Sequence, residues 1–232
     1  TAGFKDVLAI RNGIRPDIYN LHVPRPAQLV AREHCVEVGE RVTTGGKVLK
    51  PLQDEEIDRV IKQLADIEPG SIAICLLFSY SNDEHESKLA QRIREAFPYI
   101  PVTVSSEIVR EFREYPRTST TVINAGLRPI VGSYLESVQG KIEESGVHAP
   151  FLVMQSNGGC AVATRSAQES HRLILSGPAG GAAGLVTLGH QHNLDKLIGL
   201  DMGGTSTDIC LIKDGKLPLK STQIINDHTL LA

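Results

Sequence analysis

Residues 197–213, LIGLDMGGTSTDICLIK, constrain the fold more than any other segment of the chain. Two short apolar runs flank the adjacent glycines Gly203 and Gly204, a pattern that predicts a strand, a turn and a second strand. Glycine lacks a Cβ atom and allows positive φ, so successive backbone N–H groups can point at one anion. Three hydroxyl residues follow the glycines: Thr205, Ser206 and Thr207. Because hydroxyls donate to phosphate oxygens, the segment predicts a phosphate-binding hairpin, with an ordinary glycine-rich hairpin as the alternative.

An aspartate stands on each side of this turn, Asp201 before it and Asp208 after it. Hard divalent cations such as Mg²⁺ take carboxylate and water oxygens as ligands. We therefore predict that the two carboxylates hold a metal ion and are the catalytic residues of the site. The segment lacks the Lys-Ser/Thr ending of a P-loop, and the apolar run after it is too short for the helix of a dinucleotide-binding fold.

Composition sets wider bounds on the class of protein. With 232 residues, 41% of them hydrophobic and 22% charged, the chain is predicted to be a soluble globular protein. A net charge of −3 with scattered charges predicts no nucleic-acid partner. The apolar runs are too short to span a membrane, and the first residues do not form a signal peptide. The four cysteines are far apart and lack zinc spacing, which indicates reduced thiols in a cytoplasmic protein.

The first half of the chain reads as alternating strands and helices after a loop-rich start at residues 1–26. A hairpin is predicted over residues 30–50, and Asp54 is predicted to cap a helix that stops at Pro69-Gly70. A buried strand at 71–78, a helix from Asn82 or Asp83 to Pro98, and a strand at 102–105 follow. This order predicts a mostly parallel sheet with helices packed against it.

The segment 107–117 is crowded with charged residues. A solvated helical face with charge pairs three and four residues apart is one interpretation. The other is that Arg113 or Arg117 reaches an anionic substrate. A long helix is predicted over 118–145, kinked or divided by Pro129 and ended by Gly146.

Three further places are candidate sites or contacts. A buried parallel strand at 151–154 ends in Gln-Ser-Asn-Gly-Gly, which makes Asn157 and Gly158 candidate substrate contacts, with a plain tight turn as the alternative. Ser176 is predicted to cap a helix that opens with Gly177, and glycines at 177, 180, 181 and 184 predict tight packing of another backbone. His228, beside Asp227, is a candidate metal or substrate ligand.

The turn at 201–208 resembles the DxGGTxxD phosphate loop of the actin, sugar kinase and heat-shock chaperone ATPases, called the ASKHA superfamily. Residues 176–184 resemble the small-residue helix that precedes the second phosphate loop there. Five segments resemble, in order, the A-type subunit of the ATP-dependent hydantoinase/oxoprolinase family: ICLLFSYSNDEHE, VTVSSEIVREFREYPRTSTTVINAGLRP, LVMQSNGG, LILSGPAGGAAG and IGLDMGGTSTDICLI. The similarity extends from about Val30 to Ile212.

The resemblance implies ATP-dependent opening of a cyclic amide such as hydantoin or 5-oxoproline, or carboxylation of a ketone. ATP would activate a carbonyl or carboxyl oxygen by phosphorylation, with Mg²⁺ on Asp201 or Asp208 and a B-type subunit as a probable partner. Charge neutralisation and positioning are what such a transfer asks of a protein. The residues that would bind the nucleotide are Gly203, Gly204, Thr205, Ser206, Thr207, Ser176 and Gly177.

The fold implied by the resemblance is α/β, with actin-like (ribonuclease H-like) lobes of mixed sheets and packed helices. Residues 1–175 would form part of the N-terminal lobe, and residues 176–232 the start of the second. Because the superfamily has two phosphate loops and only the second type occurs here, we expect a fragment with an incomplete nucleotide cleft that is inactive alone. A non-catalytic nucleotide-binding or assembly module is the alternative, and the segments 113–121 and 154–159 disfavour a sugar kinase.

Overall fold

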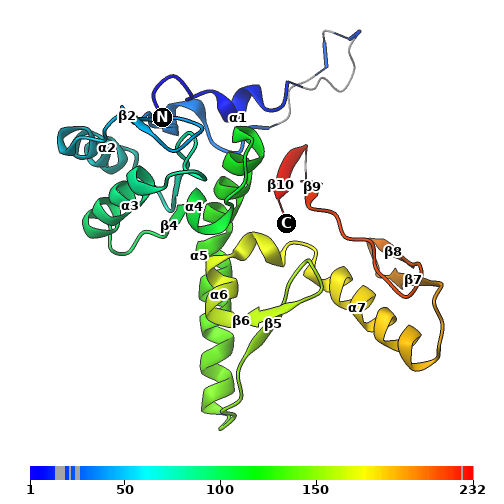
Figure 1. The fold of residues 1–232 in the computed structure, drawn as a ribbon. Coiled ribbons are helices and arrows are strands. Elements are labelled where there is room, and N and C mark those ends of the chain that lie inside the picture. Colours follow the sequence, from blue (N-terminus) through cyan, green and yellow to red (C-terminus); the bar gives the residue numbers. More distant parts are fainter. Residues whose placement is uncertain (14–18, 21, 24–26, 226, 232) are drawn as a thin grey trace. The chain divides into compact units, whose positions relative to one another are not determined.

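The computed structural model describes residues 1–232 except 14–18, 21, 24–26, 226 and 232, so the loops predicted near Pro16 and Pro24 lie outside the described residues. Two compact units are present (Figure 1). The first unit contains Thr1–Pro129 and Gln223–Leu231, and the second contains Ile130–Thr222.

The first unit is built from short strands and helices. In chain order these are α1 (Val7–Ile10), the 3-10 helix η1 (Arg32–His34), β1 (Arg41–Val42), β2 (Val48–Lys50), α2 (Asp54–Ile67), β3 (Ile72–Ile74), α3 (Glu84–Ala96), β4 (Val102–Val104), α4 (Ser105–Ile108), the first part of α5 (Glu114–Glu144), β9 (Thr222–Ile225) and β10 (His228–Leu231). Its core is apolar: Ile57 and Val60 of α2, Leu89 and Ile93 of α3, and both strands of the β3–β4 pair are buried.

The β3–β4 pair is parallel, with Ile72 opposite Val102 and Ile74 opposite Val104. Parallel neighbours need a long crossover, and α3 supplies it while packing against β4. The predicted strand–helix–strand order over 71–105 is therefore confirmed, although both strands are shorter than the apolar runs suggest.

The prediction of a mostly parallel sheet is wrong. Among the described residues each sheet has two strands, and the pairs β1–β2, β5–β6 and β7–β8 are antiparallel. Turns of a few residues join these pairs, and a connection that short returns the chain only in the opposite direction. The predicted strand at 30–42 is likewise mostly irregular, because η1 occupies its first half and only β1 pairs.

The helix ends predicted from glycine agree with the structure better than the N-caps predicted from polar side chains. Gln53, not Asp54, is the N-cap of α2, and Asp54 begins the helix. At the end of α5, Gly146 has φ +76°, its N–H donates to Glu143 O, and the N–H of Val147 donates to Ile142 O. This pair of bonds is a Schellman motif and confirms the predicted stop at Gly146.

Pro129 does not divide the long helix, since α5 is continuous from Glu114 to Glu144. Proline removes one backbone N–H from the helical ladder. The neighbouring bonds are enough to carry the helix past this gap. Of the two predicted effects of Pro129, division of the helix is therefore wrong, and a kink stays a prediction.

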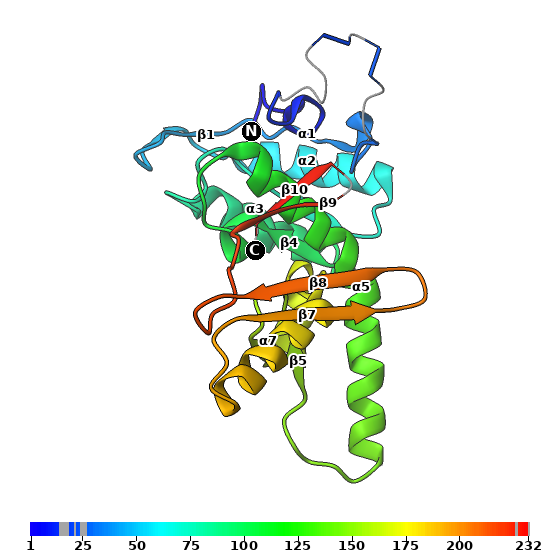
Figure 2. The same cartoon turned by 90° about the vertical axis from the view of Figure 1, so that its right-hand side faces the viewer.

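The second unit contains two hairpins and the helices beside them. Its elements are β5 (Leu152–Met154), β6 (Cys160–Val162), α6 (Ala163–Gln168), the 3-10 helix η2 (Ser170–Leu173), α7 (Ser176–Gln191), β7 (Leu197–Met202) and β8 (Thr207–Ile212). Helix α7 contacts β5 and both strands of the β7–β8 hairpin, and Figure 2 shows the hairpin running beside α7.

Tight packing in this unit depends on glycines other than the predicted ones. A Cβ at Gly177, Gly181 or Gly184 would meet no described atom within 4 Å, and one at Gly180 would meet only the Met154 side chain, at 3.6 Å. Within the described residues, the predicted close approach of another backbone to these four glycines is therefore wrong. A Cβ at Gly199 of β7 would instead lie 2.6 Å from Cys210 Sγ and 2.9 Å from a Leu185 methyl carbon. Gly189 is equally confined, by Leu194 O at 2.8 Å.

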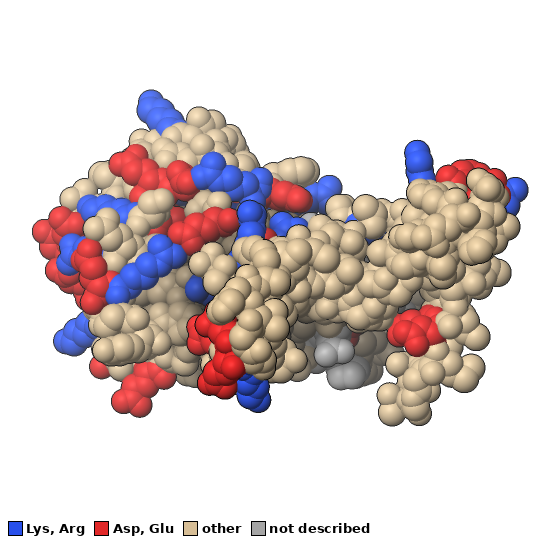
Figure 3. Space-filling model, turned by 90° about the horizontal axis from the view of Figure 1, so that it is seen from below, with Lys and Arg blue, Asp and Glu red and all other residues tan. Residues whose placement is uncertain are grey.

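Surface charges of both signs lie next to one another on the face shown in Figure 3. Interspersed charges produce a weaker long-range field than a patch of one sign. No helix in the described part of the chain combines the length and the apolar character needed to cross a bilayer.

Arg117 is fully buried in the first unit, which contradicts a solvated face at this residue. Its guanidinium donates to Ser79 Oγ, Ser105 Oγ, the Glu114 carboxylate, and Leu76 O at 2.6 Å. Glu86 is also fully buried, 3.8 Å from the guanidinium, and accepts from Leu76 N at 2.7 Å. Buried charges persist only when paired and hydrogen-bonded, so this network ties β3, α3, β4 and α5 together.

We predict that Arg117→Met destabilises the protein by about 3–5 kcal/mol, because it leaves buried carboxylates without their cation. Chemical denaturation followed by circular dichroism measures this change. Arg94→Met is the matched control, since it removes an exposed ion pair with Glu107 and is expected to change stability little. Equal stability of Arg117→Met and the wild type would contradict the structural role.

His171 in η2 is buried, and burial together with the nearby Arg172 cation lowers its pKa from 6.5 to about 4. The unfolded chain therefore binds a proton between pH 6.5 and pH 4 that the folded chain does not. Stability is complete above pH 6.5 and falls as the pH drops toward 4, by roughly 3 kcal/mol for this group.

We predict that His171→Gln flattens the dependence of unfolding free energy on pH between 6.5 and 4, because it removes the titrating imidazole. Urea unfolding at half-unit pH steps measures the slope. His148→Gln, at an exposed position, is the control and should keep the wild-type slope. A slope that His171→Gln leaves unchanged would show that other groups cause the acid sensitivity.

Candidate functional site

The predicted hairpin over 197–213 is confirmed. Strands β7 and β8 are antiparallel, and Asp201 lies opposite Asp208, with Met202 opposite Thr207 at the turn end. The turn is closed by a hydrogen bond from Gly203 N to Ser206 O at 2.9 Å. Residues 201–209 are all exposed.

The register assigns side chains to the two faces of the hairpin. The pairs Ile198–Leu211 and Leu200–Ile209 share one face, and their side chains are 59–73% exposed. Because side chains alternate along a strand, Gly199–Cys210 and Asp201–Asp208 share the other face.

Leu185 of α7 lies against that second face. The two aspartates therefore project on the α7 side of the hairpin, next to each other. Like charges directly opposite in a ladder repel, and a shared cation would relieve the repulsion.

The turn glycines do not adopt a left-handed conformation. Neither Gly203 nor Gly204 has a positive φ, so the turn does not use the conformational freedom that glycine allows. A Cβ at Gly204 would meet nothing within 4 Å, and one at Gly203 would make only an ordinary contact with Ser206 O at 3.5 Å. Internal packing therefore does not require glycine here, and the missing side chains leave the turn backbone open from outside.

Ser176 and Gly177 begin α7, but Ser176 does not cap it. Leu175 is the N-cap, with φ 63°, and no side chain accepts a capping hydrogen bond. Leu185 lies near Gly199 and Gly189 lies near Leu197, so α7 and β7 run in opposite directions. The N-terminal end of α7, with its partial positive charge, therefore points toward the turn end of the hairpin.

Asn157 and Gly158 form the tight turn of the antiparallel β5–β6 hairpin. Gly158 has φ +80° and donates to Gln155 O at 3.0 Å, and Asn157 Oδ1 accepts from Gly159 N at 2.9 Å. The expectation of a parallel strand end is wrong, because β6 returns beside β5 at once, and the alternative of a plain tight turn is confirmed. A contact of these residues with substrate stays a prediction.

The two arginine candidates have different environments. Arg117 is 0% exposed and surrounded by its internal partners, so it presents no atom to a substrate from solvent. Arg113 is exposed, with φ 80° and its guanidinium 5.2 Å above the Phe112 ring. Substrate binding by Arg113 stays a prediction.

His228 begins β10 in the first unit and is 6% exposed. Its Nε2 donates to Ala27 O at 3.0 Å, and Arg11 lies 3.4 Å from the same nitrogen. Burial and the Arg11 cation lower the pKa of this histidine. A neighbouring guanidinium disfavours a metal ion at the imidazole. No group of three or more His, Cys, Asp or Glu side chains gathers for a metal among the residues described.

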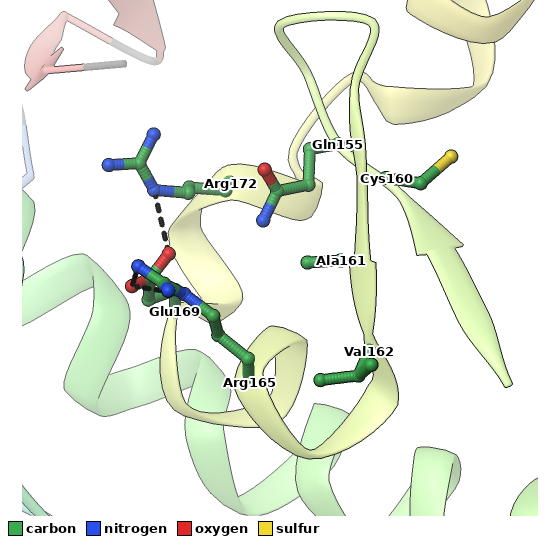
Figure 4. A pocket seen from close by; sticks show the side chains of 7 residues that line it. All are labelled: Gln155, Cys160, Ala161, Val162, Arg165, Glu169 and Arg172. Carbon is green, nitrogen blue, oxygen red and sulfur yellow. Dashed lines mark hydrogen bonds and ion pairs between the residues drawn. The ribbon is translucent and has the colours of Figure 1, made fainter. Parts of the chain in front are cut away.

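One feature of the second unit was not predicted from the sequence. A pocket of about 410 Å³ is lined by Gln155, residues 160–162, Arg165, Glu169 and Arg172 (Figure 4). Its charged side chains come from α6, from η2 and from the residue between them. The available signal was the Arg–Glu–Arg spacing of four and three residues, which puts the three side chains on one side of a helical turn.

Two family models match the chain. The hydantoinase/oxoprolinase model matches residues 117–232, and the model of the hydantoinase/oxoprolinase N-terminal region matches residues 1–97. An uncharacterized protein of Methanocaldococcus jannaschii is 36% identical, covering 100% of this chain and 32% of that protein. Caprolactamase subunit alpha of Pseudomonas jessenii is 34% identical over 93% of this chain and 31% of its own length. 5-oxoprolinase 1 of Arabidopsis thaliana is 34% identical over 90% of this chain and 18% of its own length.

Solved structures agree with the sequence comparison. The ATP-dependent caprolactamase of Pseudomonas jessenii superposes with a TM-score of 0.81 at 35% identity, over 91% of this chain and 31% of that one. A nucleotide-free acetone carboxylase superposes with a TM-score of 0.86 at 26% identity, over 100% of this chain and 34% of that one. The chain thus spans about a third or less of the length of these relatives. Both family models and these relatives show that the chain belongs to the hydantoinase/oxoprolinase family.

Proposed function

We propose that this chain supplies one phosphate-binding half of the ATP site of an ATP-dependent cyclic amide hydrolase of the hydantoinase/5-oxoprolinase type. The observation that carries the proposal is the register of the β7–β8 hairpin, which sets Asp201 opposite Asp208 beside an open glycine turn. The relatives named 5-oxoprolinase and caprolactamase support the choice of an amide substrate.

Each part of the hairpin has a distinct role in this proposal. Backbone N–H groups at Gly203 and Gly204 and the hydroxyls of residues 205–207 would bind the β- and γ-phosphates, since no Cβ blocks their approach. Asp201 and Asp208 would hold Mg²⁺ through carboxylate and water oxygens. Ser176 and Gly177 lie at the N-terminal end of α7, and the partial positive charge of that helix end would stabilise the negative charge of the nucleotide.

When bound, ATP would supply the phosphoryl group that activates an amide oxygen for ring opening. Phosphoryl transfer asks the protein mainly for positioning and charge neutralisation. The exposed turn offers donors for phosphate and two carboxylates for Mg²⁺, but one turn alone does not enclose and position the nucleotide. The proposal therefore includes an actin-like fold in which a second phosphate loop faces this one, and a partner subunit of the B type. A cytoplasmic location is proposed on the basis of the four free cysteines.

A second candidate function is carboxylation of a ketone. It is favoured by the likeness to the acetone carboxylase structure, which covers the whole of this chain. ATP binding at the same hairpin serves both reactions, because each requires an activated oxygen. Product analysis with hydantoin, 5-oxoproline and acetone plus bicarbonate separates them. ATP binding without turnover of any of these would favour a non-catalytic nucleotide-binding or assembly module.

We predict that Asp201→Asn lowers ATP-dependent turnover in the full-length protein by about 10²–10³-fold and raises the Mg²⁺ concentration needed, since it removes a charged metal ligand. Steady-state release of phosphate measures both effects. Asp214→Asn changes an exposed aspartate in the next turn of the same unit and is the matched control, expected to keep wild-type turnover. Normal turnover by Asp201→Asn would refute the metal-binding role.

We predict opposite effects of alanine at two glycines of this hairpin. Gly204→Ala should leave the melting temperature unchanged, because the Cβ meets nothing, yet weaken ATP binding by adding a methyl group to the phosphate-facing turn. Gly199→Ala should lower the melting temperature, because its Cβ would lie 2.6 Å from Cys210 Sγ. Thermal melts and calorimetric titration of Mg²⁺-ATP test the pair. Unchanged ATP affinity in Gly204→Ala would contradict phosphate binding at the turn.

A further inference from the structure

The pocket of the second unit lies on the β5–β6 hairpin beside α6 and η2, away from the β7–β8 turn in sequence. The Gln155 side chain enters it from the hairpin, and Arg165, Glu169 and Arg172 enter it from the helical side (Figure 4). Cys160 belongs to the hairpin wall, but its side chain points away from this charged cluster. Ser156 N donates to Arg172 O at 2.7 Å, which fixes η2 against the hairpin. Both walls of the pocket therefore belong to one unit and are held by backbone hydrogen bonds.

The charged wall carries an excess of positive charge. Glu169 Oε1 accepts from Arg165 Nε at 3.1 Å, and Arg165 Nη2 lies 2.9 Å from the same oxygen. On the other side, Arg172 Nε lies 2.9 Å from Glu169 Oε2. One carboxylate faces two guanidinium groups, which are charged at any physiological pH, so the cluster has a net charge of +1.

Within the described part of the chain, Arg172 uses only part of its hydrogen-bonding capacity. A guanidinium has five N–H donors, and Arg172 approaches Glu169 only with Nε, while its terminal nitrogens point away from Glu169 in Figure 4. The fork of an arginine matches the two oxygens of a carboxylate. Across the pocket the Gln155 side chain, on a residue only 8% exposed, presents both an amide donor and an amide acceptor.

We propose that this pocket binds a small carboxylate that also carries an amide, with the carboxylate on Arg172 and Arg165 and the amide on Gln155. Charge complementarity selects the carboxylate, and a single amide side chain satisfies one N–H and one C=O of the ligand. As a binding site the pocket does not depend on the ATP hairpin. As the substrate pocket it rests on the function proposed above.

Cys160 reports on the hairpin wall of the pocket, because it is a lining residue and the one exposed thiol of the four cysteines, with its side chain directed away from the arginines in Figure 4. We expect 5-oxoproline, which has a carboxylate and a lactam amide, to slow alkylation of Cys160 by iodoacetamide in the full-length protein without nucleotide. The matched probe 2-pyrrolidinone has the same ring without the carboxylate and should not slow it. Mass spectrometry of the Cys160 peptide measures the rates.

Two substitutions test the charge argument in opposite directions. Arg172→Met should weaken 5-oxoproline binding about tenfold or more, because it removes a charge-assisted pair of hydrogen bonds. Glu169→Gln should tighten binding, because it removes the competing carboxylate and raises the cluster charge to +2. A purely structural role of the cluster would instead make both variants bind more weakly. Arg94→Met, at the exposed ion pair in the first unit, is the control and should keep wild-type affinity.

Several outcomes would overturn the proposal. Equal protection of Cys160 by both probes would remove the role of the carboxylate, and no calorimetric binding of 5-oxoproline to the full-length protein would remove the site. Weaker binding by Glu169→Gln at an unchanged melting temperature would also contradict it. Titration of Mg²⁺-ATP into the same variants separates this failure from that of the proposed function, because the hairpin site predicts unchanged ATP affinity in all of them.

Discussion

The close approach of α7 to the β7–β8 hairpin at Gly199 is the constraint on which the second unit depends. A Cβ there would lie 2.6 Å from Cys210 Sγ and 2.9 Å from a Leu185 methyl carbon, so any larger residue would force these side chains to move. The approach decides which face of the hairpin is covered. Since Asp201 and Asp208 share that face, the same contact directs both carboxylates toward the α7 side, where the proposed phosphate site would form.

Buried polar groups join the elements of the first unit to one another in addition to its apolar core. Glu86 accepts hydrogen bonds from Leu76 N, Ser105 Oγ and Ser106 N, and the Arg117 guanidinium lies 3.8 Å from its carboxylate. A second buried pair, His85 Nδ1 with Glu40 Oε2 at 2.6 Å, stands at the start of α3. Such networks are strongly destabilised by loss of one member, which gives the charged segment around Arg117 a structural reason for its composition.

The second unit presents two different chemistries. The hairpin turn carries two carboxylates and an open glycine backbone, which suit a cation and phosphate. The pocket beside Glu169 instead has an excess of positive charge and the buried amide of Gln155. Membership of the hydantoinase/oxoprolinase family makes both relevant, because its relatives named here include enzymes for amides and an ATP-dependent carboxylase. An ATP half-site and a carboxylate site within one unit would fit an enzyme that couples nucleotide to a small polar substrate.

The sequence by itself determined those features that depend on neighbours along the chain. The hairpin at 197–213, the helix stop at Gly146 and the crossover from β3 through α3 to β4 follow from local glycines and hydrophobic period. The burial of Arg117, the antiparallel return after Met154 and the pocket between Gln155 and Arg172 were decided only by the tertiary structure. Their physical reason is that burial, strand pairing and the shape of a pocket depend on how separate elements pack, whereas the spacing of Arg165, Glu169 and Arg172 indicates only that they share one side of a helical turn.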